Sequence, residues 1–235
     1  MRDRLFATDP IPPGGFHFGP QVAEVFDDMV VRSVPQYEAL QGIMATLALR
    51  CSAGRPIYDL GCSTGTTLSR VAQRAAPGQV LVGFDNSEAM LARSRTKLGT
   101  GVLLENRDLE TLASLPHDSI GAIILCLVLM FLAPPRREPL LRMAWRHLAA
   151  GGCLLVVEKV RHEEPQHSIL VAAHEAFKRG NGYSEAEIER KREALENRLI
   201  PWRPGENLAM LRGIGAEPEI FFAALNFQGY LAIKP

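Results

Sequence analysis

The sequence predicts an α/β protein with a doubly wound, mostly parallel sheet of seven strands, N-terminal helices and a helical insert before the final hairpin. From Arg55 onward, short apolar segments alternate with segments of helical periodicity, which is typical of parallel sheets. The run "SIGAIILCLVL" is long and uninterrupted, as expected for a strand buried on both faces. The closing segments "EPEIFFAAL" and "FQGYLAIKP" are separated by a short turn and predict a hairpin.

The expected elements divide one domain, residues 1–235, into four parts. Residues 1–54 form a helical appendage, with helices in "QVAEVFDDMVVR" and "YEALQGIMATLAL" separated at Pro35. Residues 55–163 form the α/β core, 164–213 the helical insert and 214–235 the closing hairpin. The core strands are expected in "PIYDL", "QVLVGFD", "GVLLENRD", "SIGAIILCLVL" and "CLLVVEKV". Sheets of this kind bind ligands beyond the carboxyl ends of their strands.

The composition of the chain disfavours several classes of function. The chain has 235 residues, 47% of them hydrophobic and 22% charged, which is ordinary for a soluble globular protein. The formal net charge is zero, so the basic surplus typical of direct nucleic-acid binding is absent. The longest apolar run, Ile120 to Ala133, is shorter than the roughly 20 residues of a membrane span, and "MRDRLFATDP" lacks the apolar core of a signal peptide. Four cysteines without CxxC spacing predict neither a metal site nor disulfides, and they favour the cytoplasm.

The segment "YDLGCSTG", residues 58–65, lies where the first core strand meets its turn. Gly61 and Gly65 allow a tight turn and close approach of a ligand to the backbone. The spacing is not G-x-G-x-x-G, so a dinucleotide pyrophosphate is not indicated. Asp59 ends the strand with a carboxylate, which suits an amino or cationic group of a ligand.

Acidic residues also follow the second and third strands. Asp85 in "GFDNS" can accept both hydroxyls of a ribose, and Asn86 beside it can bond an adenine edge. Asp108 in "NRDLE" is placed for an adenine amino group. Each residue alone could be a turn residue or a helix cap. Their order and spacing together match the class I S-adenosylmethionine (SAM) fold and predict SAM as the bound cofactor.

A helix in the insert raises a question about charge. Ser184 with Glu187 three residues later predicts a capping box that starts the helix. Arg192 falls on the same helical stripe as the apolar residues Ile188, Leu195 and Leu199. An inward guanidinium is costly unless it meets an anion. The anion is either a ligand or an internal partner, such as a glutamate or a helix carboxyl end.

Longer segments carry a more specific resemblance. "RDRLF", "VAEVFDDMVVRSVPQY", "YDLGCS", "FDNSEAM", "HEAFKRGNGYSEAEIERKREALEN" and "NFQGYLAIK" together resemble the bacterial carboxy-S-adenosylmethionine (carboxy-SAM) synthase family. The similarity covers almost the whole chain, including the appendage and the helical insert. It implies conversion of SAM to carboxy-SAM, with prephenate as the source of carbon dioxide and phenylpyruvate as the released product. The implied route passes through a sulfonium ylide, the product serves a separate enzyme that modifies the wobble uridine of tRNA, and the family forms homodimers.

The resemblance also implies roles for residues. Arg192 would bind the new carboxylate, and Tyr37 would lie beside the cofactor, although Tyr37 could instead be an aromatic that fixes the N-terminal helix. The turn around the methionine part and the contacts to ribose and adenine would come from Gly61, Cys62, Ser63, Asp85, Asn86, Asp108 and Leu109. Cys62 would act through its backbone. His174 could touch substrate or be a structural histidine.

One position departs from the family. Cys126 stands where the family has an asparagine near the sulfonium, and a thiol cannot give the two N–H groups of an amide. Cys126 could also be a small buried hydrophobic residue. Two other functions therefore stay open. The chain could be a SAM-dependent methyltransferase for a small acidic acceptor, or a SAM-binding or carboxy-SAM-binding protein without catalysis.

Overall fold

The computed structural model describes residues 1–7 and 11–235 of the protein, so residues 8–10 of the expected appendage lie outside the described part. Within the described part, no helix has both the length and the apolar content that crossing a membrane requires.

A single sheet of seven strands in the order β3-β2-β1-β4-β5-β7-β6 organises the fold. The strands are β1 Ile57–Leu60, β2 Leu81–Asp85, β3 Leu103–Asn106, β4 Ile120–Cys126, β5 Leu148–Lys159, β6 Pro218–Ala224 and β7 Phe227–Ile233. Strands β1 to β5 pair in parallel, whereas β7 runs antiparallel to both β5 and β6. The predicted fold class, including the final hairpin, is confirmed. The strand order reverses between β1 and β4, which is where such sheets bind ligands.

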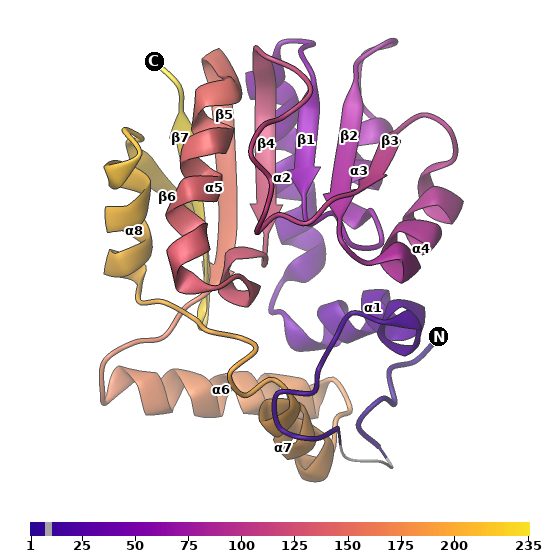
Figure 1. Ribbon diagram of the computed structural model, residues 1–235. Helices are drawn as coiled ribbons and strands as arrows, with labels where there is room; N and C mark the ends of the chain where they lie inside the picture. The colour runs from indigo at the N-terminus through magenta and orange to yellow at the C-terminus, as the bar shows by residue number, and fades with distance from the viewer. Residues whose placement is uncertain (8–10) are drawn as a thin grey trace.

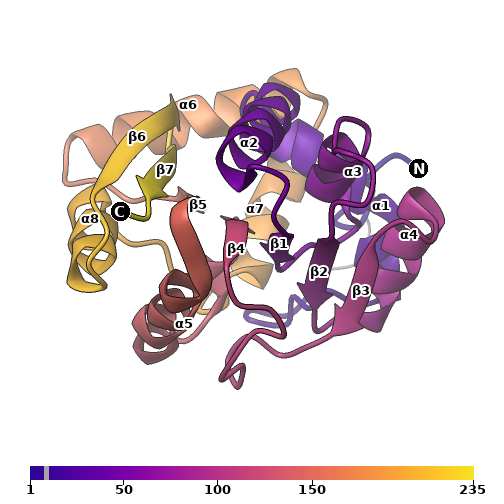
Figure 2. The ribbon, with the colours of Figure 1, turned by 90° about the horizontal axis from the view of Figure 1, so that it is seen from above.

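Helices cover both faces of this sheet, as the side and top views show (Figures 1 and 2). One face carries α2 Tyr37–Ser52, α3 Thr66–Ala72 and α4 Glu88–Leu98, and the other carries α5 Pro134–His147 and α8 Pro204–Gly213. Burial of apolar side chains between the sheet and each helical layer makes two separate cores. The central strand β4 contributes to both, since its side chains alternate between the two faces and six of its seven residues are fully buried.

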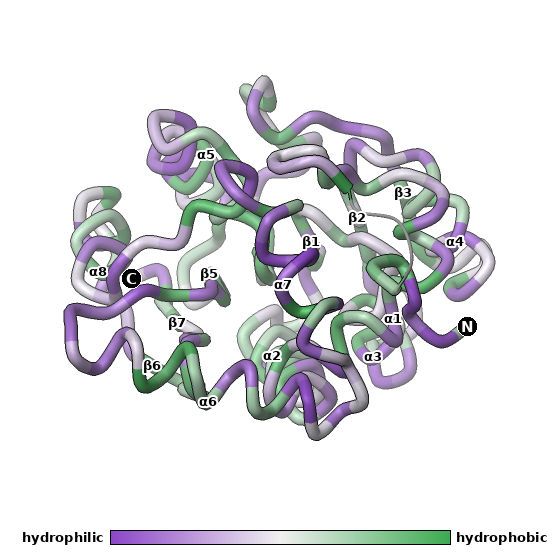
Figure 3. The backbone as a smooth tube through the Cα atoms, turned by 90° about the horizontal axis from the view of Figure 1, so that it is seen from below, coloured by the Kyte–Doolittle hydropathy of each residue, from purple (hydrophilic) through white to green (hydrophobic). Residues whose placement is uncertain are grey.

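A third group of helices lies beneath the carboxyl ends of the strands. It consists of α1 Pro20–Ser33, α6 Gln166–Gly180 and α7 Glu185–Ala194 (Figure 1). Seen from below, α7 crosses the middle of this edge, in front of the end of β1 (Figure 3). The N-terminal appendage and the helical insert are far apart in the chain, but they cover the same edge of the sheet.

A buried carboxylate shapes the segment that follows β4. Glu158, near the end of β5, accepts backbone N–H bonds from Val128 at 3.1 Å and from Leu129 and Met130 at 2.8 Å each. These bonds hold the short 3-10 helix Leu129–Phe131 against the sheet. Burial raises the pKa of Glu158 to about 7, although the backbone donors oppose that shift.

Replacement of Glu158 by alanine is expected to destabilise the protein, because it leaves buried N–H groups without an acceptor. Each such group costs about 1–3 kcal/mol, so we expect Glu158→Ala to lower the free energy of unfolding by about 3 kcal/mol or more. Chemical denaturation measures this, with the exposed Glu219→Ala as the matched control. A loss below about 1 kcal/mol would show that Glu158 does not organise the segment.

Candidate functional site

Two adjoining cavities open at the carboxyl end of the strands, with volumes of about 650 Å³ and about 480 Å³. They share the wall formed by the turn after β1 and the segment after β4. The larger cavity is lined by the predicted site residues Tyr37, Gly61, Cys62, Ser63, Cys126 and Arg192. The smaller is lined by Gly61 and Ser63 again, with Asp85, Asn86, Asp108 and Leu109. The fold thus brings all ten predicted residues to one continuous region.

The turn after β1 has a shape that its residues enforce. Gly61 has φ 83°, and a Cβ there would lie 2.5 Å from a methyl carbon of Val128, so only glycine fits. Ser63 also adopts a left-handed conformation with φ 49°. Its N–H donates to Asp85 Oδ2 at 2.9 Å, which helps to offset the backbone strain. The turn therefore presents its backbone to both cavities in a fixed position.

Asp85 is buried, and both of its carboxylate oxygens already accept hydrogen bonds from the backbone of the protein. Besides the bond from Ser63, its Oδ1 accepts the N–H of Ser87 at 2.8 Å. Burial raises its pKa, and these two N–H donors oppose the rise. Asn86 and Asp108 are exposed, whereas Leu109 is buried. The smaller cavity therefore combines polar groups at its rim with an apolar wall, an arrangement that suits a nucleoside.

Asp59 is the most unusual group in the larger cavity. The residue is only 2% exposed, and its Oδ1 has no hydrogen-bond partner among the described residues. Burial, together with the nearby Asp85, raises the pKa of Asp59 to about 7. A buried carboxylate oxygen without a partner is costly to the protein alone. An amino group of a ligand would satisfy it, which fits the methionine end of SAM.

Cys126 is the last residue of β4 and lies against a buried amide. Gln41 Nε2 is 3.7 Å from Cys126 Sγ, and Gln41 Oε1 accepts the hydroxyl of Thr67 at 2.6 Å. Gln41 is 1% exposed and lines the larger cavity. The Thr67 bond fixes which end of the amide faces Cys126, so the N–H donor of Gln41 lies beside the thiol. Gln41 could not be identified from the sequence, because the position of an α2 side chain relative to β4 depends on packing.

Tyr37, the first residue of α2, is buried and lines the larger cavity. Burial raises its pKa well above the usual range, with the nearby Cys126 and Asp27 adding to the rise. Its phenol is therefore neutral at physiological pH and available as a hydrogen-bond donor.

The predicted orientation of Arg192 is wrong. The capping box of Ser184 and Glu187 is present, but α7 ends at Ala194, and the buried residue next to Arg192 is Lys191. The Arg192 side chain is 64% exposed and lies 3.7 Å from Glu175 Oε1 and 3.4 Å from Glu189 Oε1. The buried side of α7 faces α1 and the N-terminal segment, so its phase differs from the one that the apolar residues suggested. Arg192 nevertheless borders the larger cavity.

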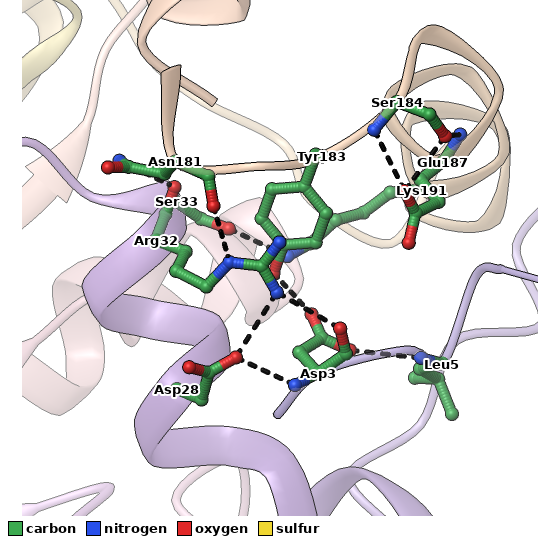
Figure 4. A network of polar contacts seen from close by, with 10 residues as sticks. All are labelled: Asp3, Leu5, Asp28, Arg32, Ser33, Asn181, Tyr183, Ser184, Glu187 and Lys191. Carbon is green, nitrogen blue, oxygen red and sulfur yellow. Dashed lines mark hydrogen bonds and ion pairs between the residues drawn. The ribbon is translucent and has the colours of Figure 1, made fainter. Parts of the chain in front are cut away.

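A polar network holds α7 in this position (Figure 4). Arg32 of α1 donates to the backbone oxygens of Asn181 at 2.8 Å and Asp3 at 3.0 Å, and its guanidinium lies 3.8 Å from the centre of the Tyr183 ring. Tyr183 in turn donates its hydroxyl to Asp3. Lys191 Nζ donates to Ser33 Oγ at 2.9 Å. The network joins the N-terminal segment, α1 and the start of α7.

His174 is buried, and it lines the larger cavity while its ring bonds to the backbone of α1. Its Nε2 lies 2.7 Å from the backbone oxygen of Ser33, and its ring packs edge-on against Phe227. Burial, with Lys178 and Lys159 nearby, lowers its pKa to about 3, so the ring is neutral and donates to that oxygen.

The sheet order and the two cavities define a class I SAM-dependent methyltransferase fold. A family model described as a methyltransferase domain matches residues 57–152. A solved complex of DhpI with SAM and HEP superposes with a TM-score of 0.62 at 16% identity, over 92% of this chain and 94% of that one, and so shares the fold.

Two curated relatives resemble the chain over its whole length with a much higher sequence identity. The carboxy-S-adenosyl-L-methionine synthase of Wolinella succinogenes is 41% identical over 241 residues, which cover 100% of this chain and 99% of that protein. The synthase of the same name from Methylococcus capsulatus is 40% identical over 242 residues, 99% of each chain. The chain belongs to the carboxy-S-adenosyl-L-methionine synthase family, which confirms the resemblance found in the sequence.

Proposed function

We propose that this protein converts SAM to carboxy-SAM, using prephenate and releasing phenylpyruvate. Membership of the synthase family supports the reaction. In the structure, the main support for this reaction is that Arg192 lines the same cavity as Tyr37 and the Gly61–Ser63 turn. A cation at the reacting end of a SAM cavity suits a product that gains a carboxylate.

Each end of the ligand has a suitable environment. Asp85, Asn86, Asp108 and Leu109 would hold ribose and adenine in the smaller cavity. Asp59 would take the amino group of the methionine part, and the turn at Gly61, Cys62 and Ser63 would wrap that part through its backbone. Bound SAM supplies an S-methyl carbon that accepts the carboxyl group.

The protein's contribution is mainly positioning and electrostatics. The contacts of Arg192 with Glu175 and Glu189 are long at 3.7 and 3.4 Å, so its planar fork can turn to a carboxylate. Prephenate loses carbon dioxide and hydroxide as its ring becomes aromatic, and the hydroxide takes the proton that the S-methyl carbon loses, forming water. A residue acting as general base is therefore not required, and Tyr37 can donate its phenol proton to an anionic oxygen.

The wider context follows from the same proposal. We place the protein in the cytoplasm as a homodimer, with a product that serves a separate enzyme modifying the wobble uridine of tRNA. The neutral formal net charge supports a small-molecule substrate over direct binding of nucleic acid.

The test of this function is mass spectrometry of the small molecule released when freshly purified protein is denatured. We expect a nucleoside heavier than SAM by one carbon dioxide, and formation of phenylpyruvate when SAM and prephenate are added. Arg192→Ala should release SAM without the carboxylated product, whereas the exposed Arg212→Ala should match the wild type. Unchanged SAM after incubation with prephenate, together with methyl transfer to an added acid, would replace this function by that of a methyltransferase.

The binding of the methionine end should depend on pH. Because the pKa of Asp59 is about 7, its ionised fraction rises between pH 5.5 and 7.5, while an α-amino group stays largely protonated. We expect the affinity for S-adenosylhomocysteine, which carries the same amino acid end, to increase on the order of tenfold over that range. Calorimetry measures it. Asp59→Asn should bind more weakly at pH 7.5 and lose the slope, and a flat wild-type profile would contradict the role of Asp59.

The amide of Gln41 should matter for ligand binding. Gln41→Leu keeps much of the side-chain volume but removes the buried N–H donor beside Cys126. We expect the dissociation constant for SAM to rise about 5- to 10-fold, which corresponds to one lost hydrogen bond of about 1 kcal/mol or slightly more. The exposed Gln73→Leu serves as the matched control. Unchanged affinity in Gln41→Leu, with a normal melting temperature, would assign Gln41 a packing role only.

A further inference from the structure

Three lysines converge on the larger cavity from separate elements. The chain has 26 basic residues, and only five of them are lysines. Lys159 ends β5, Lys178 lies in α6 and Lys191 lies in α7, and all three line this one cavity. Arginine dominates elsewhere in the chain, so the choice of lysine here calls for a physical explanation.

These ammonium groups lack acidic partners. Among residues 1–7 and 11–235, none of the three has a carboxylate oxygen within 4.0 Å. Lys191 Nζ has the hydroxyl of Ser33 at 2.9 Å, but Lys159 and Lys178 make no side-chain hydrogen bond to any described residue. Glu175, which influences both, lies against Arg192 instead. Lys159 and Lys178 therefore have no structural partner that would explain them.

The cluster carries a repulsive cost in the protein alone. Burial, with Lys178 nearby, lowers the pKa of Lys159 to about 8. Burial lowers the pKa of Lys191 to about 7; Asp3 opposes this shift, whereas Lys178, Lys159 and Arg32 add to it. The pKa of Lys178 is also lowered, by burial and by Arg192. Several cations that face one space and disfavour each other's charge would be stabilised by an anion placed among them.

We propose that Lys159, Lys178 and Lys191 form a binding subsite for the carboxyl donor, which this site recognises as a dicarboxylate. The subsite rests on the proposed function and specifies where the second substrate binds. One carboxylate of the donor lies among the lysines, and the other is directed toward Arg192 and the S-methyl group.

Lysine suits this task better than arginine. An ammonium can lose its proton when buried, whereas a guanidinium stays charged, so lysines reduce the repulsion in the empty cavity. Binding of a dianion then restores the charged forms and takes up protons between about pH 7 and 9. His174, which faces the same lysines, stays neutral throughout because its pKa is about 3.

The small number of lysines allows a direct test by NMR. Protein labelled with 13C-lysine and loaded with S-adenosylhomocysteine, so that no reaction occurs, gives five lysine signals to titrate. On adding prephenate we expect the titration midpoints of Lys159, Lys178 and Lys191 to rise by about one pH unit or more. Lys97 and Lys234, which do not line the cavity, should not move. If prephenate binds while the three midpoints stay fixed, the subsite is overturned.

Variants supply the second measurement. Lys159→Met and Lys178→Met keep the apolar stem, and we expect each to raise the KM for prephenate about tenfold with kcat changed less than about threefold. The ligand-free variants should also melt about 2–4 °C higher, because a repelling charge is removed. Lys234→Met is the matched control, since Lys234 bonds to the Trp145 backbone oxygen away from the site. Lower melting temperatures with an unchanged KM would assign the lysines a structural role and overturn the subsite.

The two proposals fail differently. If carboxy-SAM forms but prephenate leaves the lysine midpoints unchanged, the function holds and the subsite is wrong. If no carboxy-SAM forms, yet a dianion such as malonate raises the three midpoints, the lysines bind an acidic methyl acceptor, and both the proposed function and the assignment to a carboxyl donor are wrong.

Discussion

Arg32 joins the segments that close the site at the carboxyl ends of the strands. Its guanidinium binds backbone oxygens of Asp3 and Asn181, pairs with Asp28 at 3.2 Å and lies over the Tyr183 ring. One side chain therefore ties together the N-terminal segment, α1 and the link between α6 and α7. The short α7 has only Ile188, Lys191 and Ala194 buried, so its position depends on such polar contacts as well as on apolar packing. Together, α1, α6 and α7 cover the open edge of the sheet and so form a cavity there.

The cavity that results holds charges at a cost to stability. A buried carboxylate at Asp59 has an unpartnered oxygen, and three lysines of the same cavity form no ion pair within 4.0 Å among the described residues. Their opposite signs lie in one cavity, and the two sets do not form a salt bridge among the described residues. Such groups weaken the free protein and are stabilised only when charged ligands fill the space. This is the pattern expected where binding, rather than folding, sets the choice of residue.

The neighbourhood of Cys126 depends on contacts between α2 and β4. A thiol at the end of β4 cannot supply an amide N–H. The amide of Gln41, oriented by Thr67, reaches the same part of the cavity from α2. Packing between a helix and the sheet therefore places an amide N–H donor next to Cys126 in the larger cavity.

The sequence by itself determined the strand–helix alternation, the buried central strand, the final hairpin and the turn at Gly61, because these depend on local periodicity and on backbone conformations that few residues adopt. It also identified the lining residues that follow β1, β2 and β3, since strand ends in a parallel sheet meet at one edge, whereas Tyr37 and Arg192 came from the family resemblance. Only the tertiary structure decided which cation of α7 is buried. Arg192 and Lys191 are adjacent and both fit a helical stripe, and the choice depends on how α7 rotates against α1. The meeting of Lys159, Lys178 and Lys191, and of Gln41 with Cys126, was likewise set by packing between distant segments, about which local sequence carries no information.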